Sequence, residues 1–160
     1  MKQTYRVVAG LIALGVLVQA AAVAFGWFQV INEVEDGFVL DENFEGNAGH
    51  ALHGIVGLGV IPALALILLI VSFFAAKSVP QARMWGGIVF GVTLLQVALA
   101  IFGFSLPVIG ALHGLNALLL LGAAIRAMAL TRTGAGGAGG VSVPRQRSES
   151  DSATGSSLPV

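Results

Sequence analysis

The side chains in this sequence that are best suited to take part in chemistry are its three histidines, His50, His53 and His113. Two of them share the local pattern Ala-Leu-His-Gly, at residues 51–54 and 111–114. All three lie near one end of a long apolar run, where a histidine costs less than at the centre of a span, so the functional signal comes from the repetition of the pattern rather than from position alone. Imidazole can bind a metal, move a proton, or donate and accept hydrogen bonds. The spacing of the histidines helps to decide among these chemistries.

A second pattern accompanies the histidines in each half of the chain. Gln19 is followed by Phe25-Gly26, and Gln96 is followed at the same spacing by Phe102-Gly103. In both halves the glutamine pattern comes before the histidine pattern, which predicts a tandem duplication of a helical hairpin. Two parallel repeats are related by a pseudo-two-fold axis, here along the membrane normal.

Such an axis would direct His53 and His113 toward one place in the core, at one depth. Two opposed imidazoles are what a six-coordinate haem iron needs as axial ligands. The glycine after each histidine leaves room for the edge of a macrocycle, and the Ala, Gly and Leu neighbours make the slot apolar. The sequence therefore predicts a haem site with these two axial ligands. His50, one helical turn before His53, is expected to hydrogen-bond a propionate or to serve as an alternative ligand.

Three amides accompany the histidines. Asn116 follows His113 by three residues and is expected to orient that imidazole as a supporting hydrogen-bond partner. Gln19 and Gln96 lie near the middle of their apolar runs, where interhelical hydrogen bonding is a better interpretation than metal ligation.

Two other interpretations of the histidines remain open. They could be structural and hydrogen-bond across helices or to acidic loop residues. Alternatively, His50 and His53 could form a zinc site, whose further ligands would have to come from the acidic loop.

Four apolar runs must position these residues, and each is long enough for the roughly 20 residues that a helix needs to cross a bilayer. Hydrophobic residues make up 56% of the chain, charged residues only 10%, and the mean hydropathy is +0.90, unlike a soluble domain. The sequence predicts an all-α fold, a polytopic membrane four-helix bundle over residues 1–130 in which helices 2 and 4 face each other. Pro62 is expected to kink helix 2. The predicted spans are 7–28, 49–76, 84–105 and 110–130.

The charges are sorted by sign along the chain. Basic residues flank one set of helix ends: Lys2, Arg6, Lys77, Arg83, Arg126 and Arg132. Acidic residues gather in the loop 29–48: Glu33, Glu35, Asp36, Asp41, Glu42 and Glu45. The positive-inside rule predicts a plasma-membrane protein with both termini cytoplasmic and this loop outside. Cysteine is absent, which excludes thiol chemistry and a disulfide in the loop.

The two ends of the chain need separate interpretation. Residues 1–22 resemble a secretory signal with a cleavage site at Ala20-Ala21-Ala22, and cleavage there would leave three helices. A spanning helix is favoured because the apolar run continues to Phe28. Residues 131–160 are rich in Gly, Ser and Arg and are predicted to form a disordered cytoplasmic tail.

The stretch from Gln96 to Leu121 resembles the corresponding helices of haem A synthase, with Leu106-Pro107 in the connection and His113 opening a Leu/Ala-rich helix. That family is built from two four-helix halves with histidine ligands on the second and fourth helices near the outer face. Over residues 7–130 the resemblance implies one half of the type that binds haem b. The chain is also similar to small four-helix bacterial membrane proteins, which implies location and topology only.

This sequence departs from the haem A synthase pattern at two places. In the catalytic half of that family a glutamate lies three residues before the helix-2 histidine, where this chain has His50. The outer-loop cysteine pair of many members is missing. These departures argue against oxygenation of a haem methyl group, so a binding protein is expected rather than an enzyme.

The leading prediction is haem b binding between helices 2 and 4, for electron transfer or haem handling. The alternative is a non-catalytic accessory or scaffold subunit whose loop and tail contact other proteins. A transporter is not favoured because no acidic residue lies within a span. The expected partners are the lipid bilayer and a redox protein, a membrane complex or a second copy of the chain, and no nucleic acid.

Overall fold

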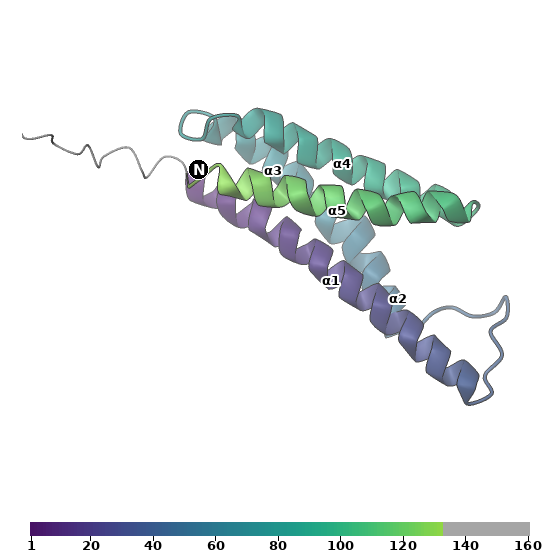
Figure 1. The fold of residues 1–160 in the computed structure, drawn as a ribbon. Helices are drawn as coiled ribbons and strands as arrows, with labels where there is room; N and C mark the ends of the chain where they lie inside the picture. The colour runs from purple at the N-terminus through teal and green to yellow at the C-terminus, as the bar shows by residue number, and fades with distance from the viewer. Residues whose placement is uncertain (133–160) are drawn as a thin grey trace, which may run out of the picture.

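The computed structural model describes residues 1–132, which fold into helices joined by short connections (Figure 1). These helices form four rods. The first is α1 (Lys2–Glu35), and the second is made of α2 (Ala48–Ile55), the π-helical turn η1 (Val56–Val60) and α3 (Ile61–Ala75), which follow one another without a break. The third rod is α4 (Ala82–Gly103) and the fourth is α5 (Pro107–Ala129). Each rod is long and apolar enough to cross a membrane. The predicted all-α, multi-pass architecture is therefore confirmed.

The bounds of α1 differ from the predicted span 7–28. The helix continues in register to Glu35, and the Gln29 side chain donates a hydrogen bond to the Glu33 carboxylate over 2.9 Å. Hydropathy marks the apolar part of a helix only, whereas polar pairs four residues apart can extend it beyond the bilayer. The loop between α1 and α2 is consequently 36–47, shorter than the predicted 29–48.

The core of the bundle lies at the end of the molecule that holds the N-terminus. Around the bundle the packing order is α1, α3, α4 and α5, so that the second and fourth spans lie diagonally opposite each other. Tyr5, Ile12, Leu68 and Leu120 are fully buried there, and the Tyr5 hydroxyl donates to the carbonyl of Ala82 over 3.3 Å. This packing holds the two hairpins together at one end.

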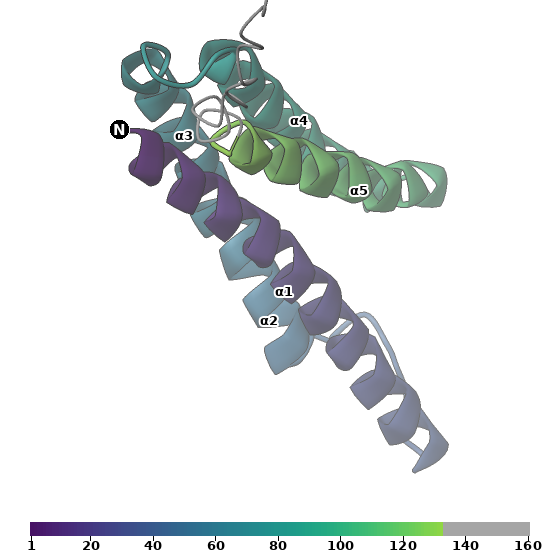
Figure 2. The same cartoon turned by 60° about the vertical axis from the view of Figure 1, so that its left-hand side comes forward.

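Toward the opposite end the two hairpins diverge, as Figures 1 and 2 show from two directions. There α2 packs on α1 rather than across the bundle. Contact within each hairpin depends on glycine: a Cβ added at Gly49 would lie 2.6 Å from the backbone of Ala22 and Gly26, and one at Gly103 would lie 3.1 Å from Gly110. The missing side chains allow the paired helices to approach closely.

The second span is distorted immediately before Pro62. Ile61 N–H donates to the carbonyl of Val56, five residues back, which is the pairing of a π turn. Pro62 has no N–H and cannot extend the α-helical ladder through this point. The irregularity next to Pro62 is the π turn η1, and the expected bend of the helix axis stays a prediction. Pro107, by contrast, is the first residue of α5, where a missing N–H costs nothing.

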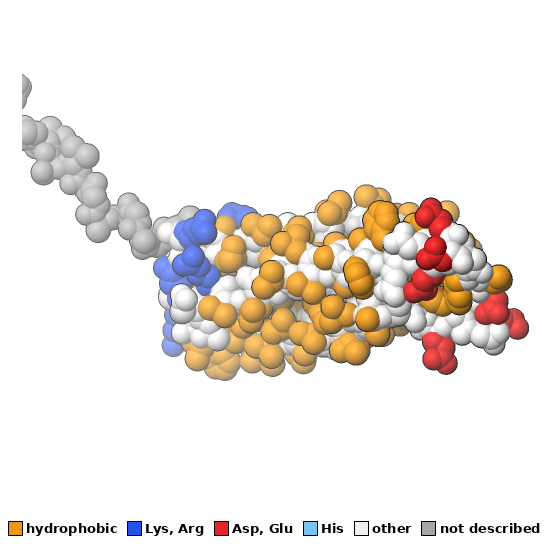
Figure 3. All heavy atoms as spheres, turned by 90° about the horizontal axis from the view of Figure 1, so that it is seen from below, with side chains coloured by type: hydrophobic (Ala, Val, Ile, Leu, Met, Phe, Trp, Pro, Cys, Tyr) orange, Lys and Arg blue, Asp and Glu red, His pale blue; other side chains and the backbone are white. Residues whose placement is uncertain are grey.

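The surface of the described residues has three zones along its length (Figure 3). Lys and Arg side chains gather at one end, Asp and Glu side chains at the other, and hydrophobic side chains cover the region between them. Large apolar residues within the four candidate spans are exposed, among them Phe25, Ile55, Leu115 and Leu118. A surface of this kind fits a lipid bilayer. Of the predicted tail 131–160, residues 131–132 form a turn after α5, and the rest lies outside the described residues.

Candidate functional site

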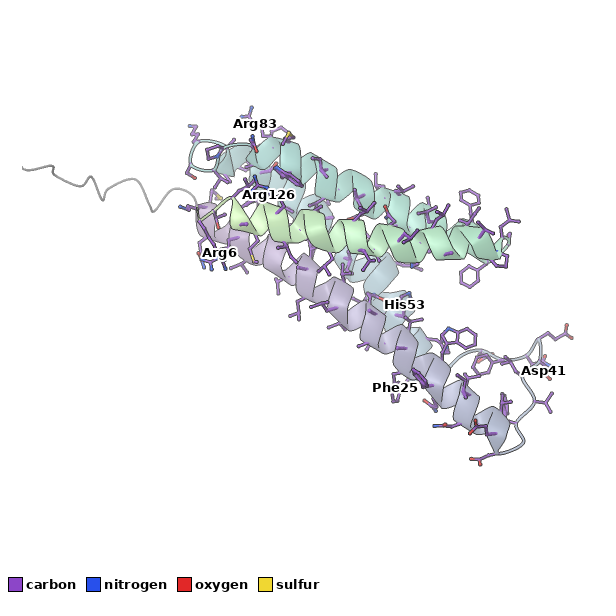
Figure 4. The ribbon with its side chains drawn as sticks, viewed as in Figure 1. Arg6, Phe25, Asp41, His53, Arg83 and Arg126 are labelled. Atoms are coloured by element: carbon purple, nitrogen blue, oxygen red, sulfur yellow. The ribbon has the colours of Figure 1, made fainter. Side chains whose placement is uncertain are left out.

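The His53 and His113 side chains meet across the two hairpins. The centroids of their rings are 6.2 Å apart and the ring planes are inclined by 66°. His53 comes from α2 and His113 from α5, and Figure 4 places His53 where the hairpins begin to diverge. The structure therefore brings the two predicted axial ligands together, although the chain separates them by a complete hairpin.

Each imidazole is held by a backbone carbonyl of the preceding span. His53 Nδ1 lies 3.1 Å from the carbonyl oxygen of Gln19 in α1, and His113 Nδ1 lies 3.1 Å from that of Gln96 in α4. A carbonyl oxygen can only accept, so Nδ1 carries the proton in both rings. The neutral ring then has its lone pair on Nε2, the state that a metal-binding histidine requires.

The distance between the rings suits one shared iron. Since a metal–imidazole bond is about 2 Å long and a ring nitrogen lies about 1 Å from its ring centroid, two axial imidazoles have centroids roughly 6 Å apart. The observed separation of 6.2 Å agrees with that value. The separation is compatible with two ligands of one iron, but it is equally that of an ordinary edge contact between two rings, and Nε2 of His113 contacts the Gln96 amide.

The glycines next to the histidines have no evident packing role. A Cβ added at Gly54 or at Gly114 would meet no atom within 4 Å. The same holds for Gly59, Gly87, Gly91 and Gly122, and Gly114 is exposed at the surface, so the room for a macrocycle edge stays a prediction.

A hydrogen-bond network surrounds His113. The buried side chain of Asn116, 4% exposed, donates to the Val92 carbonyl over 3.0 Å and to Gln96 Oε1 over 2.7 Å. The Gln96 Nε2 atom lies 3.1 Å from His113 Nε2 and donates to its lone pair. Asn116 therefore acts on His113 through Gln96, and Gln96 is an interhelical partner as predicted.

Gln19 departs from its predicted role. Its side chain is only 8% exposed, yet within residues 1–132 neither its Nε2 nor its Oε1 has a hydrogen-bond partner. The amide lies beside Gly57, where an added Cβ would be 3.3 Å from Nε2. Val56 occupies the place, three residues after His53, that Asn116 occupies after His113. The expected interhelical bond is missing because this hairpin has no side-chain amide there to donate to Gln19 Oε1, as Asn116 donates to Gln96 Oε1.

His50 belongs to a different cluster. Its Nδ1 accepts from the backbone N–H of Asn47 over 3.3 Å, while Asn47 Oδ1 accepts from the N–H of His50, which completes a capping box at the start of α2. Its ring makes edge contacts with Trp27 and Phe44, whose ring centroids lie 5.1 Å and 5.9 Å from that of His50. These contacts place His50 in the helix cap through Nδ1, while its buried Nε2 has no hydrogen-bond partner within residues 1–132, so its role toward a propionate or an iron stays a prediction.

The zinc interpretation gains no support from the described part of the chain. Among residues 1–132, no three His, Cys, Asp or Glu side chains gather closely enough to hold a metal ion. His50 and His53 accordingly have no further protein ligand for tetrahedral zinc.

The backbone carbonyls of Gln19 and Gln96 are the site components that the sequence did not identify. A carbonyl has no residue-type signature, so only the repeated spacing of glutamine before histidine hinted at them.

No family model, no curated protein and no solved structure matches the chain. The function of the chain is therefore inferred from its own residues and their geometry.

Proposed function

We propose that this multi-pass membrane protein binds haem b between α2 and α5, with His53 and His113 as axial ligands, for electron transfer or haem handling. The observation that supports it most is the ring pair: two imidazoles 6.2 Å apart, each with Nδ1 bonded to a carbonyl. A shared iron requires a centroid separation near this value, which two structural histidines in edge contact also adopt, so the matching carbonyl contacts are needed beside it.

The matching contacts also support a tandem duplication. Each histidine bonds the carbonyl of the glutamine in the preceding span, at the same distance of 3.1 Å in both hairpins. The diagonal placement of the second and fourth spans is what a pseudo-two-fold axis along the bundle predicts. In this proposal, the two hairpins supply one equivalent ligand each.

The residues of the chain hold and tune the site. The Gln19 and Gln96 carbonyls fix both ring orientations, as hydrogen-bond partners of metal-bound histidines do. The bound haem supplies an iron that takes up and gives back one electron. The surrounding apolar spans keep water away and thereby influence the potential at which it does so.

The proposal includes an orientation in the membrane. The basic end of the molecule faces the cytoplasm, in accordance with the positive-inside rule, and the acidic loop faces outward (Figure 3). His53 lies in the first turns of the second span, so that the haem site is nearer the outer surface. The resemblance to haem A synthase implies the same depth.

An optical spectrum of the purified protein tests the proposal. The full chain is produced with a haem precursor in the growth medium, extracted in mild detergent and scanned in its oxidised and reduced forms. We expect a Soret band and the sharp reduced α-band of a haem with two nitrogen ligands, and the loss of both bands in the double variant His53→Ala, His113→Ala.

The matched control is His50→Gln, because glutamine at this position of a capping box preserves the cap while it removes the third imidazole. This variant is expected to retain the spectrum. A folded, colourless wild-type protein would exclude the proposal. If that colourless protein also purified with a larger membrane complex, the accessory-subunit alternative would replace it.

A further inference from the structure

The two histidines differ in what their Nε2 atoms contact, although their Nδ1 contacts match. Nε2 of His113 accepts a hydrogen bond from the Gln96 amide over 3.1 Å. Nε2 of His53 has no hydrogen-bond partner among residues 1–132, and the Gln19 amide, which corresponds to that of Gln96, is unpartnered. The pair is therefore asymmetric at the atoms that would bind iron.

Asn116 explains why only one glutamine reaches its histidine. By donating to Gln96 Oε1 over 2.7 Å, it orients the amide so that Nε2 points at His113. Asn116 is itself fixed by its second bond, to the Val92 carbonyl. In the other hairpin, the side chain of Val56 cannot donate a hydrogen bond, and the Gln19 amide has no partner.

We infer that Gln96 is a built-in competitor for His113 Nε2, so that His53 is the firmly held axial ligand and His113 the releasable one. A lone pair cannot accept from an amide and bind a metal at the same time. The amide of Gln96 must withdraw before His113 binds, and it stabilises His113 whenever that ligand is released. This inference rests on the proposed haem binding and adds an order to it, with His53 first and His113 second.

The rate of haem loss to an excess of an apo-globin acceptor tests the inference, with the full chain in detergent. Gln96→Leu removes the competing donor at nearly constant volume. Since one hydrogen bond contributes a factor of roughly two to ten, haem loss should slow by about that factor. Gln19→Leu removes the unpartnered amide of the other hairpin, and its effect on the rate should be clearly smaller.

Asn116→Val provides a second variant if Gln96→Leu does not fold. It places in α5 the residue type that α2 has at Val56, so the Gln96 amide loses its orienting partner. Haem loss should again slow, by less than in Gln96→Leu.

A measurement on the haem-free protein separates competition from a general effect on packing. In the ¹⁵N NMR spectrum of labelled histidines, Gln96→Leu should shift the Nε2 resonance of His113 and leave that of His53 in place. Equal haem-loss rates in Gln96→Leu and wild type, or an unmoved His113 resonance, would overturn this inference and leave the haem site standing. A colourless wild type would instead remove the proposed function and this inference together.

Discussion

At the scale of single residues, two histidines with the same sequence neighbours have different surroundings. Both donate through Nδ1 to a carbonyl at 3.1 Å, and only His113 also accepts from a glutamine amide. The difference traces to one position, Asn116 against Val56. A repeated sequence pattern can therefore place two equivalent histidines and still give them unequal hydrogen bonds.

Single-histidine variants should show this inequality. His113→Ala is expected to keep more haem than His53→Ala, because Nε2 of His53 is free of a protein competitor and can hold the iron alone. The haem content per protein chain, measured as the pyridine haemochrome, provides the comparison. Equal retention, or more haem in His53→Ala, would mean that the Gln96 contact does not rank the two ligands.

At the scale of helices, glycines set how closely the helices of the first hairpin pack. Gly49 faces the backbone of α1, where an added Cβ would lie 2.6 Å from Ala22 and Gly26, while Gly54 faces open space. Both residues lie in α2, so replacing either one by alanine changes the helix propensity in the same way. A difference in stability between the two variants therefore reports the contact with α1.

The paired variants Gly49→Ala and Gly54→Ala test this contact. Gly49→Ala should destabilise the protein by about 1–3 kcal/mol, because the backbone of α1 cannot move aside cheaply. Gly54→Ala should be neutral or slightly stabilising, since alanine is the better helix former. Unfolding in mixed detergent and SDS, followed by circular dichroism, measures both, and equal stability of the two variants would contradict the close approach at Gly49.

The cap of α2 offers an independent check on its start. Asn47 accepts from the N–H groups of Gly49 and His50, and its side-chain amide donates to the Gly26 carbonyl over 2.8 Å. Asn47→Ala should cost about 0.5–2 kcal/mol. Faster proteolysis within the loop 36–47 of detergent-solubilised protein would reveal the loss, whereas unchanged cleavage would show that the cap does not hold the loop.

Much of the helical arrangement was predictable because length and hydropathy directly determine which segments can span a bilayer. The extension of α1 to Glu35 was not, because polar residues beyond the apolar run carry no hydropathy signal. The pairing of His53 with His113 followed from the repeated tetrapeptide. The capping role of His50 could not be foreseen, since it depends on where α2 begins and on the aromatic side chains of Trp27 and Phe44.

At the scale of the whole molecule, charge is separated along the bundle axis by an apolar band (Figure 3). Arg126 and Arg83 illustrate the basic end, where each guanidinium lies over an aromatic ring, at 5.7 Å from Trp85 and 5.5 Å from Phe73. Asp41 marks the opposite end (Figure 4). This polarity predicts one orientation in the membrane.

Cysteine labelling can establish that orientation cleanly, because the chain contains no cysteine of its own. In intact cells, Asp41→Cys should react with a membrane-impermeant maleimide. Ser78→Cys, in the turn between α3 and α4, should react only after permeabilisation. The reverse pattern would invert the proposed topology and place the histidine pair near the cytoplasm.

The central claim is that His53 and His113 bind one iron from opposite sides, and electron paramagnetic resonance of the oxidised protein tests it most directly. We predict the low-spin signal of a haem with two imidazole ligands in the wild type, and a high-spin signal in His113→Ala. A high-spin wild type, or a low-spin signal that is unchanged in His113→Ala, would contradict the claim.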